Sequence, residues 1–272
     1  MLSDEEEDIK YRLSVFDARH MNDPNEGHVL EQYLNSGITQ NIEMNEICQT
    51  RQTFRNTFTF LKSFTTKIDC LPMWVQYAND GQGCQVIIDP DMFVKADQVV
   101  KKKENDFLNG LLIEDDYSLY HVAYFDGKDF KISNGKIVTR EIEALRNSYE
   151  KLIEQLYEEK DEDGFYTEFM YVIDNILSRV KYLIKKEDYS SEAEVRVMFF
   201  RAGTEIDLEQ TAVDSNGFPK IFIHFKVPTQ IREIILGPKV KKGYDVVPYI
   251  YKQLGKMSKN TIRVTRSGIE YI

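Results

Sequence analysis

Several short stretches of the chain alternate between hydrophobic and polar positions, which is typical of β-strands. The alternation predicts strands at 11–18, at 53–63, in CQVIID after the turn at 81–83, and in SLYHVAYFDG. It returns towards the end of the sequence in EVRVMFF, KIFIHFKV, IREIILG and TIRVTRSGIEYI. Strands are therefore predicted in both the first and the last part of the chain.

Hydrophobic positions in the middle of the chain instead recur every three or four residues, which predicts two long helices at 139–159 and 164–184. In the second helix the recurring positions are Phe165, Phe169, Val172, Ile176 and Val180. Shorter helices are predicted after Asp23, after Asp69, at 93–109 and at 245–253.

The segment NDPNEG carries the signals of a helix start. Asp23 is predicted to cap the helix, Pro24 suits its first position, and Glu26 completes a capping box. Helix initiation explains these three residues. Asn22 is not needed for the cap, so its amide is a candidate for a binding site.

Asp69 is predicted to cap the next short helix, one face of which carries Met73, Trp74 and Tyr77. An aromatic cluster at this spacing buries a large apolar area and is usually part of a core. The alternative is that these rings stack on a planar ligand.

Strands near both ends with helices between them predict an α+β fold with a mixed or antiparallel central sheet. Neither an internal repeat nor a linker rich in Pro and Gly divides the sequence. We therefore expect one domain over 1–272, with a helical hairpin inserted at about 139–185.

The formal net charge of −10 argues against a dedicated nucleic-acid binder, because the phosphate backbone requires a basic surface. A negative net charge is still compatible with binding of a small anionic ligand in a local basic pocket. No apolar run is long enough to span a membrane, and the acidic start MLSDEEEDIK is unlike a signal peptide. A cytoplasmic location is expected.

The three cysteines and four histidines are scattered without the spacing of metal ligands, so no metal is predicted. The cysteines fit a reducing compartment.

Glu192 and Glu194 lie two positions apart in a predicted strand and so share a face, which Arg196 continues. Paired carboxylates at the end of a strand can transfer protons or stabilise a developing positive charge. The alternative is structural: Glu194 or Arg196 forms a salt bridge to a neighbouring strand.

Four segments, in this order, resemble a bacterial domain-of-unknown-function family, number 2971. They are HMNDPNEG, SFTTKIDCLPMWVQYANDGQGCQVII, YSSEAEVRVMFF and IREIILGP. The matching positions are Asp69, Leu71, Met73, Trp74, Tyr77, Gly83, Glu192, Glu194 and Arg196. The resemblance extends from Arg12 to about Pro238. Members of the family usually carry an aromatic-Thr or His-Tyr-Thr strand before the Asn-Asp-Pro, whereas here about twenty residues with an acidic start precede it.

Three elements also resemble, more remotely, the site of ADP-ribosyltransferases. They are Arg12 on the first strand, the segment Ser63-Phe64-Thr65, and the segment Glu192-Ala193-Glu194. This resemblance implies an ADP-ribosyltransferase-like fold with NAD as substrate and no metal.

The same resemblance implies roles for these residues. Glu194 would be the catalytic carboxylate with Glu192 beside it, as carboxylates act in glycoside cleavage. Arg12 would bind the phosphates. The other substrate-binding candidates are Ser14, Asn22, Ser63, Thr65, Trp74, Tyr77 and Arg196.

Two functions follow from these residues. The first is an NAD-cleaving enzyme, acting as a toxin or phage-defence effector with a protein as a potential acceptor. The second is a non-catalytic module of the same fold that senses a small nucleotide ligand or interacts with a protein. They differ in whether Glu194 faces a cleft or is held in an ion pair.

Overall fold

The structure is a computed structural model. It describes residues 12–21, 23, 25, 27–36, 38, 57–94, 118–158, 173, 176–202, 211–213, 217, 219–225, 227–241, 243–254 and 262–271. The chain forms two compact units. The first unit consists of Met1–Ser14, Thr65–Gly110 and His224–Ile272, and the second consists of Val15–Phe64 and Leu111–Ile223.

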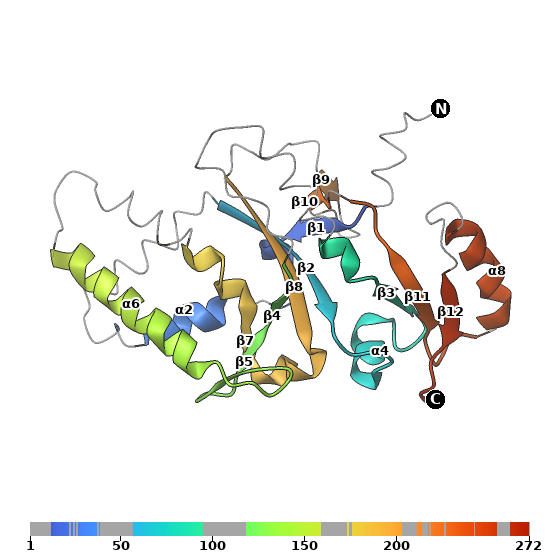
Figure 1. Ribbon diagram of the computed structural model, residues 1–272, viewed down its shortest axis with the longest axis horizontal. Coiled ribbons are helices and arrows are strands. Elements are labelled where there is room, and N and C mark those ends of the chain that lie inside the picture. The colour runs from blue at the N-terminus through green and yellow to red at the C-terminus, as the bar shows by residue number, and fades with distance from the viewer. Residues whose placement is uncertain are drawn as a thin grey trace. The chain divides into compact units, whose positions relative to one another are not determined.

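Within the described residues, the largest sheet has six strands in the order β4-β8-β2-β1-β10-β9. The strands are β1 (Ser14–Asp17), β2 (Thr57–Thr65), β4 (Tyr120–His121), β8 (Glu194–Ala202), β9 (Thr211–Val213) and β10 (Pro219–His224). β2 and β8 are neighbours in this sheet and lie side by side (Figure 1). β1 runs antiparallel to β2 with Phe16 opposite Leu61, and β4 runs antiparallel to β8.

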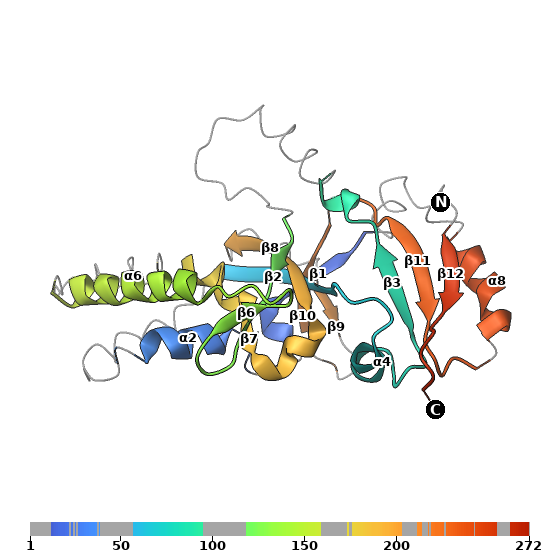
Figure 2. The ribbon, with the colours of Figure 1, turned by 60° about the horizontal axis from the view of Figure 1, so that its bottom comes forward.

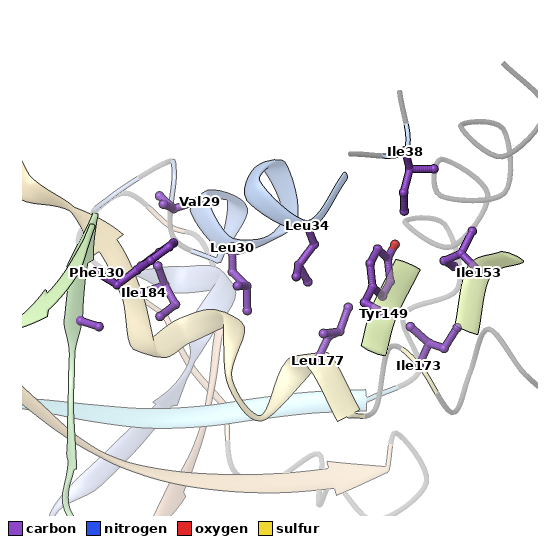
Figure 3. Packing of buried hydrophobic residues seen from close by; sticks show 11 residues of the cluster. Val29, Leu30, Leu34, Ile38, Phe130, Tyr149, Ile153, Ile173, Leu177 and Ile184 are labelled. Atoms are coloured by element: carbon purple, nitrogen blue, oxygen red, sulfur yellow. The ribbon is translucent and has the colours of Figure 1, made fainter. Parts of the chain in front are cut away.

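A smaller sheet in the second unit has the order β6-β5-β7, and it packs with two helices. These elements are α2 (His28–Asn35), β5 (Ala123–Phe125), β6 (Phe130–Ile132), α6 (Thr139–Glu158) and β7 (Ile184–Lys186). Leu30 and Leu34 of α2 meet Leu177, Tyr149 and Ile153 in one buried cluster (Figure 3). This cluster forms because α2 and α6 each turn a hydrophobic face towards it.

The first unit contains a three-stranded sheet with the order β12-β11-β3 (Figure 2). Its elements are α4 (Leu71–Tyr77), β3 (Cys84–Ile88), β11 (Ile231–Leu236), α8 (Gly243–Leu254) and β12 (Arg263–Arg266). β11 runs antiparallel to β3 and parallel to β12. Leu254 of α8 packs against Ile234 and Leu236 of β11 and against Ile262.

The α+β class is confirmed, with several mixed or antiparallel sheets. Most predicted strands and the helices α6 and α8 lie where the sequence pattern put them. The segment SLYHVAYFDG is an exception, because it divides into β4 and β5, which belong to different sheets.

The predicted start of α2 is wrong. The helix begins at His28, and the residue before it, Gly27, has a left-handed conformation with φ of 80°. Asp23 does not cap the helix: its Oδ1 accepts a hydrogen bond of 2.9 Å from the Asn25 N–H. The aspartate therefore forms a local turn, and the chain enters the helix only after the glycine. Pro24 and Glu26 lie outside the described residues.

The second long helix also ends earlier than predicted. Residues 176–178 are helical, but a 3₁₀ turn, η2 (Lys181–Leu183), and then β7 follow. Ile184 pairs with Ala123 in a parallel register, so sheet pairing replaces the last helical turn. Of the predicted helix at 93–109, residues 95–109 lie outside the described residues.

Candidate functional site

The Glu-x-Glu-x-Arg segment differs locally from its prediction. Glu192 is not on the strand: it ends the 3₁₀ segment η3 (Glu187–Glu192), and β8 begins at Glu194. Ala193 between them has a left-handed φ of 45°. Two glutamates alternating along one strand would share a face, but here a turn at Ala193 brings the two carboxylates together. Glu194 and Arg196 do lie on one face of β8 and are in contact.

Lys185 of β7 joins the two carboxylates. Its Nζ lies 2.8 Å from Glu192 Oε2 and 3.0 Å from Glu194 Oε2. Arg196 Nε donates to Glu194 Oε1 at 2.7 Å, and its Nη2 donates to Oε2 at 3.1 Å. Arg196 Nη1 donates to the carbonyl oxygen of Tyr182. We call Lys185, Glu192, Glu194 and Arg196 the charge cluster.

The charge cluster is buried and balanced, with two carboxylates facing two cations. Glu194 is 4% exposed and Arg196 is 0% exposed. Burial alone would raise the pKa of Glu194, but the charge and hydrogen bonds of Arg196, together with Lys185, outweigh it. The pKa of Glu194 therefore lies below its usual range, and the side chain is ionised at neutral pH.

Two tyrosines border the charge cluster. The hydroxyl oxygen of Tyr124 accepts the Glu194 backbone N–H at 2.8 Å. Burial, together with the charges of Glu194 and Glu192, raises the pKa of Tyr124 to about 12, so the phenol stays neutral. The ring of Tyr189 lies 5.0 Å from Lys185 Nζ, within the range of a cation–π contact.

Ser63 of β2 also lies near Glu194. Its hydroxyl contributes to the lowered pKa of Glu194. Within the part of the chain that the structure describes, the buried Ser63 Oγ makes no hydrogen bond of ordinary geometry. Among the residues predicted for the site, the second unit thus brings together Ser63, Glu192, Glu194 and Arg196.

Lys185, Tyr124 and Tyr182 were not predicted from the sequence. Lys185 directly follows the predicted helix at 164–184, a position at which a lysine is normally solvated. The only sequence signal for Lys185 was the net charge of the Glu-x-Glu-x-Arg segment. Two carboxylates and one arginine leave one negative charge, and a buried group of this kind requires another cation.

The other predicted site residues lie mainly in the first unit, which contains Arg12, Ser14, Thr65, Trp74 and Tyr77. Their assembly with Glu194 into one site stays a prediction. Asn22 lies outside the described residues.

His224, in the same unit as Arg12, has a lowered pKa. Burial is the main cause, and the positive charge of Arg12 lowers the pKa further.

Trp74 of α4 is only 2% exposed, whereas Tyr77 is 55% exposed. The indole Nε1 donates to Asp69 Oδ1 at 2.7 Å. The prediction that Asp69 caps α4 is wrong: the N-cap residue is Cys70, and it makes no side-chain cap. Asp69 fixes the indole instead of the helix start.

Among the described residues, no group of His, Cys, Asp or Glu has the arrangement of a metal site. No described helix combines the length and hydrophobicity needed to cross a membrane.

Comparison with known proteins gives one family match. Residues 73–197 match the family model described as "Protein of unknown function (DUF2971)". The matched segment contains Trp74 of α4 and the whole charge cluster. Searches of curated proteins and of solved structures found no match. Over this segment, the chain is similar to the DUF2971 family.

Proposed function

We propose that the chain is a non-catalytic module that senses a ligand or interacts with a protein, and that its charge cluster is structural. One observation carries the proposal: both carboxylate oxygens of Glu194 are already bound, Oε1 to Arg196 and Oε2 to Arg196 and Lys185. A carboxylate that acts on a substrate needs an oxygen directed at that substrate.

The electrostatics support the same proposal. A carboxylate stabilises an oxocarbenium-like transition state through its negative charge. In the charge cluster, Arg196 and Lys185 neutralise the charge of Glu194 at contact distance. The neutral cluster therefore exerts only a weak electrostatic field on a positive charge that develops outside it.

A surface feature favours interaction with a protein. Ile68, Leu71, Val75 and Tyr77 are exposed on and just before α4. Exposed apolar side chains gathered on one short element are more typical of an interaction surface than of ordinary solvent-facing structure.

The second candidate is the NAD-cleaving, ADP-ribosyltransferase-like enzyme, with NAD as its substrate. The proximity of the Ser63 hydroxyl to Glu194 favours it, because the resemblance implies that these two residues act together. For this activity, Arg196 and Lys185 would have to release one oxygen of Glu194 when NAD binds.

One experiment separates the two candidates. The purified chain and its Glu194→Gln variant are incubated with NAD, with cell lysate added as a source of acceptors, and free nicotinamide is followed by mass spectrometry. We expect no release from either protein, and a lower melting temperature for the variant. Glu150→Gln is the matched control, because Glu150 pairs with Arg146 at a partly exposed position on α6.

Release of nicotinamide by the unchanged chain would overturn the proposal. If Glu194→Gln then stopped turnover while keeping its melting temperature, Glu194 would be catalytic. Binding of NAD without turnover, measured by calorimetry, would instead identify a nucleotide-sensing module.

A further inference from the structure

Unusual backbone conformations gather at both ends of α4. Among the described residues, four residues other than glycine have a left-handed φ, and three of them flank this helix. Asp69 before it has φ of 50°, while Asn79 and Asp80 after it have φ of 48° and 54°. Most side chains disfavour this conformation, Asn and Asp less than others, and contacts with neighbouring groups stabilise it further.

The segment Ser267–Tyr271 supplies the support at the first end. The carboxylate of Asp69 accepts a hydrogen bond of 2.5 Å from Ser267 Oγ and one of 2.7 Å from the Gly268 N–H. The same carboxylate holds the indole of Trp74. Asp69 thus ties this distant segment to the middle of α4.

The same segment contacts the turn at the other end of α4. The Tyr271 hydroxyl donates to Asp80 Oδ1. Lys239 Nζ lies 2.9 Å from Asp80 Oδ2 and 3.9 Å from the centre of the Tyr271 ring. These contacts fix the side chain of Asp80 and so stabilise the turn that contains it.

Ser267–Tyr271 holds the two ends of α4 with different strength. Asp69 meets a buried indole and a backbone N–H, whereas the side chain of Asp80 is 51% exposed. Water and salt compete with contacts at so exposed a carboxylate. The contacts of Tyr271 with Asp80 are therefore expected to be weaker than those of Ser267 and Gly268 with Asp69.

We propose that Ser267–Tyr271 is a releasable strap on α4. When bound, it stabilises Asp69 and Asp80 in their left-handed conformation and keeps Trp74 buried. When it detaches, beginning at Tyr271, these residues relax and α4 moves together with its exposed side chains Leu71, Val75 and Tyr77. This device does not depend on the function proposed above.

Trp74 reports on the strap directly, because it is the only tryptophan in the chain. The test compares the unchanged protein with the double variant Ser267→Ala, Tyr271→Phe during heating. In the variant, we expect the tryptophan emission to shift to the red and acrylamide quenching to increase before far-UV circular dichroism changes. Ser148→Ala is the matched control, since its hydroxyl bonds Ala144 on α6.

If emission and quenching change only together with the circular dichroism in the variant, Ser267–Tyr271 is a static part of the unit and the proposal fails. Hydrogen exchange on the unchanged protein tests it without substitutions. The Gly268 N–H bonds Asp69, and the Gly81 N–H bonds the Trp74 carbonyl. A releasable strap requires these two amides to exchange together and faster than those of β11, and equal protection would contradict it.

Discussion

Arg196 is a guanidinium without any contact with solvent, and such a group is tolerated only when its charge and its donors are matched. Glu194 and the Tyr182 carbonyl provide the match. Lys185 does the same for the remaining charge of the two glutamates. Each member of the charge cluster is therefore needed because the other members are present.

Replacing Lys185 with Met tests this dependence. The substitution leaves a buried negative charge without a partner, so we expect the free energy of unfolding to fall by about 3–5 kcal/mol. Urea denaturation measures the loss. Lys131→Met is the control, since Lys131 pairs with Asp126 at the surface and its loss is expected to change little. Equal losses in the two variants would contradict a structural role for the cluster.

The lowered pKa of Glu194 predicts loss of stability in acid. A carboxyl group with a lower pKa in the folded than in the unfolded state stabilises the fold above its unfolded pKa. That stabilisation disappears as the pH falls below 4.5 and through the folded pKa. We expect the unfolding free energy to drop across this range, and to drop less in Glu194→Gln. Parallel pH profiles for the two proteins would show that other carboxyl groups cause the acid loss.

At the scale of elements, α4 and its turns depend on a close approach of three glycines. The Gly237 N–H bonds the Gly83 carbonyl at 2.9 Å. A Cβ at Gly237 would lie 2.2 Å from the Gly81 carbonyl oxygen, which is too close for any side chain. The end of β11 and the turn after α4 are thus packed backbone against backbone.

Gly237→Ala is expected to lower the melting temperature and to shift the emission of Trp74, because the turn after α4 must move. Gly268→Ala is the control, since its Cβ would have ordinary contact at 3.6 Å from Asp69 Oδ2. Differential scanning calorimetry compares the two variants, and similar melting temperatures would refute the packing argument.

Sequence patterns predicted most elements, because hydrophobic periodicity depends on which face of an element is buried. They failed where a tertiary contact decides the outcome. Asp23 and Asp69 have the side chains of helix caps, yet one forms a turn and the other holds Trp74. Glu194 and Arg196 were predicted to share a face, but Lys185 was not predicted because it comes from another sheet.

On the scale of the whole molecule, both units are assembled from distant parts of the chain. The first unit combines three segments and the second combines two. Local patterns carry no information on which distant segments meet, so the contact of Ser267 with Asp69 was not predictable from the sequence. Contacts of this range also slow folding, since the intervening chain must first be ordered.

The overall charge leads to a prediction for the complete chain. With a net charge of −10, the protein is expected to repel a polyanion. Fluorescence anisotropy with labelled duplex DNA should show no binding at physiological salt. Binding that weakens steeply with added salt would reveal a basic surface and would contradict this expectation.

The charge cluster has a consequence for how related sequences diverge. Losing one of Lys185, Glu192, Glu194 and Arg196 leaves a buried charge unmatched, whereas exchanging a whole ion pair for apolar residues of similar volume is often neutral. Selection should therefore remove single substitutions at these positions, whereas paired substitutions should be tolerated. Aligned homologues are expected to show covariation among the four positions, either all charged or replaced in pairs.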